Sequence, residues 1–299
     1  YFTLAADQKD IKSMYQLGMI YYNNEFIPRD INRAIKYFVD ASKLNDSNSL
    51  LQLGMIYYHG LFVPVDVQKS IYYLESASNL NNSYASYLLG MIYMSNYGIE
   101  KDVKKSISYL KKASMLENSD AQFQLGVIYY TGKGVSRDIN KSIYYFELAS
   151  RNKNSEASLS LAIIYLIGEF VRKDITKAKY YFYLASSDNN LEALFLLSIL
   201  NLSGIFFEKN ISDGIYYLEI AANKNHLEAQ YQLALNYYSG VFIPQNINEA
   251  IRYLQYASNR NHSESQYFLG YIYYSGKYVP KSIEMAIHYL NLSSKNNNS

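Results

Sequence analysis

Cysteine is absent from this sequence of 299 residues, so the chain has neither disulfides nor thiolate metal sites. A reducing compartment fits that absence. An excess of one charge is also missing, because 28 basic and 26 acidic residues give a net charge of +2 and a pI of about 8.3. The chain therefore has no strong field that would attract nucleic acid or an anionic membrane.

Long hydrophobic runs are absent as well. The longest apolar stretch, LEALFLLSILNLSGIFF at residues 191–207, is interrupted by Glu, Asn, Ser and Gly. It falls short of the roughly 20 apolar residues that a spanning helix needs, so we expect no direct membrane insertion. The N-terminus lacks a signal-peptide pattern, and Tyr1 is not an initiator Met. We therefore expect a fragment whose targeting signals could lie outside it.

The sequence is instead rich in one repeated pattern with a period of 36 residues. A leucine recurs at this spacing eight times without an insertion, and a small residue follows it each time. A tyrosine row and an alanine row keep the same spacing. The leucines are Leu17, Leu53, Leu89, Leu125, Leu161, Leu197, Leu233 and Leu269, and the tyrosines are Tyr37, Tyr73, Tyr109, Tyr145, Tyr181, Tyr217, Tyr253 and Tyr289. Such a period is typical of one elongated body built from stacked units.

The first half of each repeat has apolar residues at helical spacing. A serine often precedes this pattern and is the predicted N-cap, namely Ser47, Ser83, Ser119, Ser155 and Ser263. Ser119 and Ser263 have Gln122 and Gln266 three residues on, as in a capping box. Glycine is expected to end this first helix in a left-handed turn, at Gly60, Gly132, Gly168, Gly204, Gly240 and Gly276.

The second half of each repeat also predicts a helix. It begins after a residue of the N-cap type in all eight repeats, namely Asp30, Asp66, Asp102, Asp138, Asp174, Asn210, Asn246 and Ser282. It ends at Asn-rich pairs such as Asn81-Asn82, and Asn tolerates the left-handed conformation that a tight turn requires.

Two amphipathic helices cannot bury both apolar faces alone, so each repeat must pack on the next. We therefore predict an all-α solenoid of about eight helix-turn-helix repeats of 36 residues in residues 10–293. Residues 1–9 would be the end of a truncated repeat, with Tyr1 on the tyrosine row. Residues 294–299 would be a polar tail, and the whole chain a single solenoid domain.

The pattern resembles the SEL-one-like repeat (SLR), a relative of the tetratricopeptide repeat. The family pattern AxYxLGxxYxxGxxVxxDxxKAxxYxxxAA appears as AQFQLGVIYYTGKGVSRDINKSIYYFELAS at residues 121–150. The resemblance implies a right-handed α-solenoid whose first helices line a concave surface, and a function as an adaptor between proteins. The departures concern turn geometry and one packing position: Asn45, Asn81 and Asn189 replace a turn glycine, Asn24 and Asn96 replace a loop glycine, and Asn201 replaces a tyrosine.

Residues for catalysis or metal binding are few. Among the four histidines, His226 and His262 occupy the same turn position in adjacent repeats, and a paired metal site is the alternative to the favoured interpretation as polar turn residues. A row of acids (Asp120, Glu156, Glu192, Glu228 and Glu264) is interpreted as a complement to the helix dipoles. We therefore predict no enzyme, no metal and no cofactor.

Nucleic acid is not an expected partner, because Lys and Arg do not accumulate in one register and the first-helix positions that would carry an RNA code are mostly apolar. A protein partner is expected instead, along the side of the first helices that the resemblance makes concave. Tyr, Met and other apolar residues share this side at spacing i, i+4, i+7. The candidate residues are Tyr15, Met19, Tyr22, Leu51, Met55, Tyr58, Tyr87, Met91, Met94, Phe123, Val127, Tyr130, Tyr238 and Tyr274.

Tyrosine combines an apolar ring with a hydroxyl, and methionine adapts its shape to irregular ligands. Our hypothesis is therefore a groove for an extended peptide or a partner helix. The alternative is that tight curvature buries this row between neighbouring first helices.

The sixth repeat differs from the others. Leu194 and Leu196 stand where most repeats have Gln or Ser, Gly214 replaces Ala or Ser, and Asn201 sits at a packing position. The interpretations are a local kink, an apolar convex patch for a partner or for self-association, and a merely degenerate repeat. The open ends of a solenoid are a second route to self-association.

We predict a non-catalytic protein-protein interaction scaffold. The alternative is a regulatory or substrate-recruiting arm of a larger enzyme, with a kinase or a ubiquitin-ligase/ER-degradation complex as the family-level expectation. The sequon at Asn201 falls on a packing position where a glycan could not fit. This favours the cytoplasm over the ER lumen.

Overall fold

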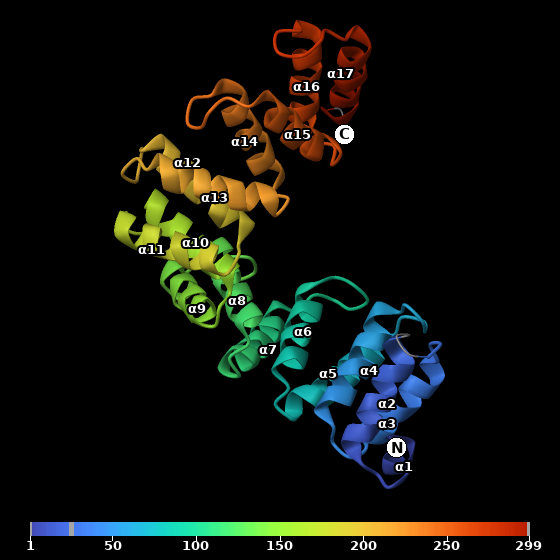
Figure 1. The fold of residues 1–299 in the computed structure, drawn as a ribbon. Helices are drawn as coiled ribbons and strands as arrows, with labels where there is room; N and C mark the ends of the chain where they lie inside the picture. Colours follow the sequence, from blue (N-terminus) through green and yellow to red (C-terminus); the bar gives the residue numbers. More distant parts are fainter. Residues whose placement is uncertain (1, 24–26, 298–299) are drawn as a thin grey trace. The chain divides into compact units, whose positions relative to one another are not determined.

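A computed structural model describes residues 2–23 and 27–297 of the chain (Figure 1). Within them the chain forms seventeen α-helices and no strand, which confirms the predicted all-α fold. Tyr1 on the predicted tyrosine row, Asn24 at the loop-glycine position and the last two residues of the expected polar tail lie outside the described residues. Residues 294–297 of that tail continue the last helix.

The chain divides into two compact units, Tyr1–Ala157 and Ser158–Ser299. The first unit contains α1 (Phe2–Asp7), α2 (Ile11–Asn23), α3 (Ile31–Ser42), α4 (Ser47–His59), α5 (Val67–Asn79), α6 (Ser83–Met94), α7 (Val103–Met115), α8 (Ser119–Thr131) and α9 (Ile139–Arg151). Helix α10 (Ser155–Ile167) contains the boundary. The second unit continues with α11 (Ile175–Ser187), α12 (Leu191–Ser203), α13 (Ile211–Asn223), α14 (Leu227–Ser239), α15 (Ile247–Ser258), α16 (Ser263–Ser275) and α17 (Ile283–Asn297).

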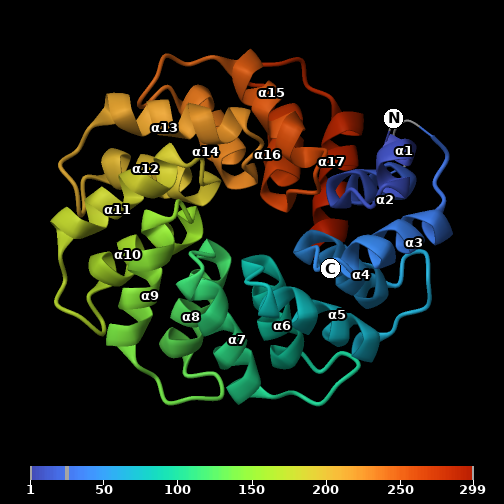
Figure 2. The same cartoon turned by 90° about the horizontal axis from the view of Figure 1, so that it is seen from below.

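Each unit has two layers of helices. In the first unit, the first helices of the repeats (α2, α4, α6 and α8) lie on the inner side of a curve, and the second helices (α3, α5, α7 and α9) lie on the outer side (Figure 2). In this unit α2, α4, α6 and α8 each pack on the second helix of their own repeat, and α6 also contacts α8 directly. Within the second unit, α12 and α14 lie inside α13 and α15 in the same way.

The leucine row forms the core between the layers. From Leu53 onward every leucine of the row is fully buried, while Leu17 is 7% exposed. The small residue beside it gives the second helix room: a Cβ added to Gly126 would lie 2.4 Å from the Phe146 ring, and one added to Gly54 would lie 2.6 Å from Leu74. The small residue therefore allows the paired helices to approach closely.

The caps of the second helices agree with the prediction. Each residue from Asp30 to Asn246 in this row accepts a hydrogen bond from the backbone N–H three residues on, and Ser282 does the same with its hydroxyl. The glycines that end the first helices, such as Gly60 and Gly132, have the predicted left-handed backbone.

The predicted serine caps of the first helices are wrong by one residue. Asp46, Asn82, Asn118, Asn190, His226 and His262 cap these helices instead, so that Ser47, Ser83, Ser119 and Ser263 begin the helix itself. Ser155 likewise begins α10, and the Asn154 side chain accepts from the N–H of Ala157. The reason is the turn: one left-handed residue, for example Asn81 with φ 59°, is followed by one extended residue, which is the cap.

The predicted capping boxes are wrong for the same reason. The side chain of Gln122 donates through Nε2 to the carbonyl of Ser114 at the end of the preceding helix, and Gln266 donates to Ser258. These buried glutamines therefore join a second helix to the first helix that follows it. The turn asparagines that replace glycine keep the left-handed geometry, with φ 63° at Asn45 and 61° at Asn189.

Candidate functional site

The predicted groove residues are half-buried in the inner layer. This holds for the three positions of α2, α4, α6 and α8 and for Tyr238, whereas Tyr274 is 58% exposed. Several pack against the following repeat: the Tyr58 ring lies 5.8 Å from that of Tyr97, and the Tyr22 ring lies 6.0 Å from that of Phe62. The row thus contributes to packing between repeats and also keeps part of each side chain accessible.

The predicted apolar patch of the sixth repeat is wrong at Leu194. Its side chain is only 3% exposed and lies in the core with Leu218 and Leu233. Leu196 is half-buried against the core of the same unit. Neither side chain is an open surface anchor, because each packs against a core cluster of neighbouring helices.

The other two departures of the sixth repeat have local explanations. Gly214 is required by Leu202, because a Cβ on Gly214 would lie 2.6 Å from the Leu202 Cγ. Asn201 is 2% exposed, and its Nδ2 donates to the Leu197 carbonyl one turn earlier. Contacts within the sixth repeat therefore accommodate both unusual residues. Asn201 lies at the packing position that the sequence predicts.

Pairs of stacked tyrosines join the two helices of most hairpins. Each of these pairs contains one tyrosine of the predicted row and a second tyrosine in the first helix of the same repeat. These partners were not predicted from the sequence, although they lie sixteen residues earlier each time. Ring centroids lie about 6 Å apart and the rings are nearly parallel in Tyr21–Tyr37, Tyr57–Tyr73, Tyr93–Tyr109, Tyr129–Tyr145, Tyr165–Tyr181, Tyr237–Tyr253 and Tyr273–Tyr289. A cation often covers the first ring, as Lys69 does at 4.0 Å from the Tyr57 ring centroid.

One of these pairs contacts a carboxylate. The hydroxyl of Tyr109 donates to Glu75 Oε1 at 2.9 Å, and the hydroxyl of Tyr93 donates to the same oxygen at 3.5 Å. Burial, the hydrogen bond to Glu75 and its negative charge raise the pKa of Tyr109 far above its usual range. This arrangement links α5 to the next hairpin and keeps the phenol protonated.

His226 and His262 are helix caps in the structure. The Nδ1 atom of His226 accepts a hydrogen bond from the Ala229 N–H at 3.1 Å, and its Nε2 lies 3.1 Å from Glu192 Oε2. His262 repeats this pattern with Ser265 and with Glu228 of the preceding repeat. Because Nδ1 accepts, the neutral ring carries its proton on Nε2 and donates it toward the glutamate.

Two residues of the acid row therefore do more than complement the helix dipoles. Glu192 and Glu228 each contact the capping histidine of the following repeat. The separation of 34 residues between each glutamate and its histidine was the signal for this pairing. Within residues 2–23 and 27–297, no group of three or more His, Asp and Glu side chains is arranged to hold a metal ion.

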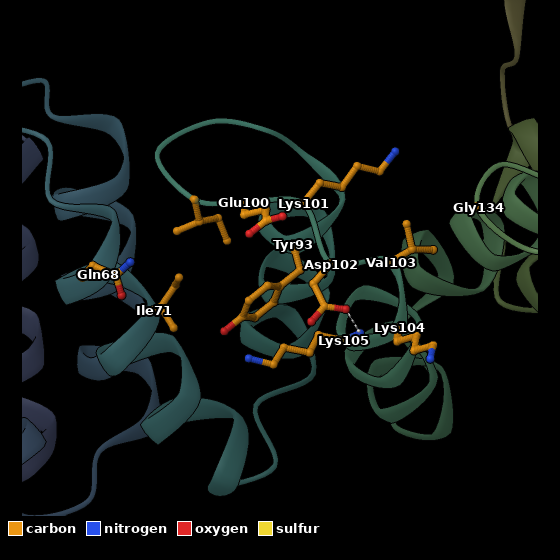
Figure 3. Close-up of a pocket in the computed structure, with 11 residues that line it drawn as sticks. Gln68, Ile71, Tyr93, Glu100, Lys101, Asp102, Val103, Lys104, Lys105 and Gly134 are labelled. Carbon is orange, nitrogen blue, oxygen red and sulfur yellow. Dashed lines mark hydrogen bonds between the residues drawn. The ribbon is translucent and has the colours of Figure 1, made fainter.

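Two cavities lie at the same position of two hairpins, where the loop enters the second helix. The larger has a volume of about 700 Å³ and is lined by Ile71, Tyr93, Ile99 and the segment from Glu100 to Lys105, together with Gly134 (Figure 3). The second, of about 520 Å³, lies in the sixth repeat beside Asn201 and Glu208. Glutamate occupies this loop position only in these two repeats, as Glu100 and Glu208.

Comparison with known proteins identifies the repeat. A family model described as Sel1 repeat matches eight consecutive segments: 11–46, 47–82, 83–118, 119–154, 155–190, 191–226, 227–262 and 263–298. The chain belongs to the Sel1 repeat family. The resemblance read from the leucine, tyrosine and alanine rows is thus confirmed over nearly the whole sequence.

Two solved structures show the same fold. A Sel1 repeat protein from Oxalobacter formigenes is 24% identical, with a TM-score of 0.81 over 100% of this chain and 87% of that one. The protective antigen c5321 of uropathogenic Escherichia coli, which displays an SLR fold, is 20% identical with a TM-score of 0.82. That match covers 98% of this chain, which spans 63% of the antigen's length. No curated protein sequence matches the chain.

Sel1 repeat proteins generally act as scaffolds for protein-protein interaction. Every helix in the described part of this Sel1 chain is too short or too polar to cross a bilayer. Two features of the first unit are candidate contact surfaces: the inner layer of first helices, and the cavity at the beginning of α7.

The imidazole cap of a Sel1 hairpin can be tested at α16. Replacing His262 with alanine is expected to lower the free energy of unfolding by about 1 kcal/mol, because the first turn of α16 loses its cap. His262→Asn should retain most of the stability, since Asn82 and Asn118 cap other first helices. Urea unfolding followed by circular dichroism measures both. An equal loss in the two variants would instead assign the contribution to the ring contact with Tyr231 or to the pairing with Glu228.

Proposed function

We propose that this Sel1 repeat protein is a non-catalytic scaffold that binds an extended peptide or a helix of a partner protein along its inner layer of first helices. One observation carries the proposal: the same three positions of consecutive first helices hold Tyr, Met, Leu, Phe and Val side chains that are half-buried and not sealed off. Packing already restricts these side chains, so binding a partner costs little further conformational entropy.

The chemistry of the row suits a polypeptide ligand. Tyr58 packs against the ring of Tyr97, and both Tyr58 and Tyr130 are only half-buried, so part of each side chain remains accessible. Met91 lies between them in the sequence of repeats and adds an adaptable apolar contact. Aromatic anchors in such settings dominate binding energy at protein interfaces.

Removing the three side chains tests the proposal. Peptides selected from a random display library on the wild-type chain serve as probes, and their affinity is measured for the variant Tyr58→Ala, Met91→Ala, Tyr130→Ala. We expect binding to weaken about tenfold or more, because interface anchors of this kind each contribute over 1 kcal/mol. Helical content should remain that of the wild type, since all three side chains are only half-buried.

The outer layer of the same unit offers a matched control. Tyr72, Met115 and Tyr144 are 65%, 78% and 56% exposed, and their replacement by alanine removes the same three side-chain types. Selected peptides should bind this control variant as they bind the wild type. Retained binding by the inner-layer variant, or equal loss in both variants, would show that the groove is not the binding surface.

The cytoplasm is the compartment we propose. Asn201 heads the sequon Asn-Leu-Ser, and its side chain is 2% exposed in the folded chain. A glycan added there during synthesis could not be accommodated in the core. The burial of Asn201 therefore supports a chain that does not meet the glycosylation machinery of the ER lumen.

A further inference from the structure

The outer layer of the first unit carries a concentration of positive charge on one helix. Helix α7 contains Lys104, Lys105, Lys111 and Lys112 and no acidic residue. The corresponding helix of the preceding repeat has Gln68, Glu75 and Ser76 at the positions of Lys104, Lys111 and Lys112. Comparing equivalent positions of all repeats does not reveal this cluster, because the lysines occur together in one repeat alone.

Of these lysines, Lys105 packs on the ring of Tyr93 within the molecule. Lys104 and Lys111 are exposed, and among the described residues no ion pair involves Lys101, Lys104, Lys111 or Lys112. Lysines in the first turn oppose the helix dipole, and like charges along one helix repel each other. The first turn of α7, with Lys104 and Lys105, therefore carries positive charge that an external anionic group would stabilise.

The cavity of about 700 Å³ lies at the beginning of the same helix. Figure 3 shows the Lys105 side chain passing beside the ring of Tyr93, with Ile71 on the neighbouring helix α5 across the cavity. Lys105 Nζ lies 5.0 Å from the Tyr93 ring centroid. The lining combines apolar side chains such as Ile71 and Ile99 with charged side chains of both signs, and the apolar part suits an aromatic ring better than a small ion.

Comparison of equivalent loops shows what the cavity lacks. In other hairpins the loop cation packs on an aromatic ring of the next loop: Arg29 lies 4.2 Å from the Phe62 ring centroid, and Lys209 lies 5.3 Å from that of Phe242. The residue equivalent to Phe62 beyond Lys101 is Gly134, which lines the cavity. The ring that covers this place in those repeats is therefore missing here.

We propose that the outer face of α7 and this cavity dock an acidic segment of a partner protein, with an aromatic side chain of that segment entering the cavity. The lysines pair with the carboxylates of the segment, and the incoming ring takes the place beside Lys101 that the Phe62 ring has beside Arg29. Glu100 and Asp102 line the same mouth and repel anions, so only the uncharged ring of the segment enters the cavity, and its carboxylates pair with the lysines farther along α7. This surface lies on the layer opposite the groove, so the scaffold holds a second partner independently of the first.

The test exchanges three lysines for the residues of the preceding repeat, in the variant Lys104→Gln, Lys111→Glu, Lys112→Ser. Those residues already occupy the equivalent positions of a folded hairpin, so circular dichroism should be unchanged. The probe is a fluorescein-labelled oligoglutamate peptide with one central phenylalanine, and its affinity is measured by anisotropy at low ionic strength. Binding is expected to weaken about tenfold or more, because three charge pairs are lost or reversed.

Two controls isolate the site. The variant Lys12→Asn, Lys36→Glu, Lys153→Asn has the same change in net charge at exposed positions elsewhere in the unit, and it should bind the probe within about twofold of the wild type. Replacing the phenylalanine of the peptide with alanine should weaken binding to the wild-type chain about fivefold, because the cavity loses its aromatic occupant. The inner-layer variant at Tyr58, Met91 and Tyr130 should bind the probe normally.

Three outcomes would overturn the proposal. Equal weakening in the two lysine variants means general charge attraction without a site. Equal affinity for the phenylalanine and alanine peptides removes the cavity from the interface. Tighter binding of a single-stranded RNA or of phosphatidylserine vesicles, lost in the same α7 variant, assigns the lysines to a nucleic acid or a membrane instead of a protein segment.

Discussion

Replacing Leu125 with alanine is expected to lower the free energy of unfolding by about 2–5 kcal/mol, because a fully buried side chain leaves a cavity that its neighbours only partly fill. Leu125 packs in one cluster with Leu110 and Ala113 of α7, so α8 and the second helix of the preceding repeat both lose contacts. Urea unfolding followed by circular dichroism measures the change. A stacked repeat is stabilised by its neighbours, so amide hydrogen exchange should accelerate most in α7, α8 and α9.

Leu61 provides the control for this substitution. It is 69% exposed in the loop between α4 and α5, and Leu61→Ala should change the free energy of unfolding by no more than about 0.5 kcal/mol. A similarly small effect at Leu125 would mean that the leucine row is not the core of the hairpins. A uniform acceleration of exchange over the whole chain would contradict the neighbour-by-neighbour picture of stability.

The fold was predictable because eight copies of one pattern reinforce each other. A single leucine at helical spacing is weak information, whereas Leu53 and Leu89 with their equivalents fix the register of every helix. The caps show the limit of this reasoning. Serine and asparagine are both good caps, and only the backbone turn, with one left-handed residue before the cap, selects Asn82 over Ser83.

The candidate sites were less predictable than the fold. Whether Tyr58 is buried or accessible depends on how closely neighbouring repeats approach, which the helical period does not encode. Leu194 shows the same difficulty, since an unusual apolar residue in the pattern was a core residue in the structure. The lysines of α7 were missed for another reason. The sequence was compared position by position across all repeats, and such a comparison hides a cluster that occurs in one repeat alone.

Raising the pH above about 10 is expected to unfold the chain, because many of its tyrosines have a pKa that is raised in the folded state. Burial is the largest cause for Tyr73, Tyr93, Tyr109, Tyr145 and Tyr253. Below pH 10 both states keep their phenolic protons, and the stability is fully present. Above it the unfolded chain releases protons that the folded chain retains, so the free energy of unfolding falls until the raised pKa values are reached. Far-ultraviolet circular dichroism and tyrosinate absorbance, recorded together, should show one shared cooperative step.

Tyr109 allows the cause to be separated from general alkaline damage. Tyr109→Phe removes the hydroxyl that donates to Glu75, so stability at neutral pH should fall by about 1 kcal/mol. The same variant should lose less stability than the wild type between pH 8 and pH 11, because one group with a raised pKa is gone. Tyr267→Phe, at a ring that is 59% exposed, should leave the pH dependence unchanged. If the two variants respond alike, or if helicity survives after the buried tyrosines have ionised, the stacked tyrosine pairs do not couple folding to pH.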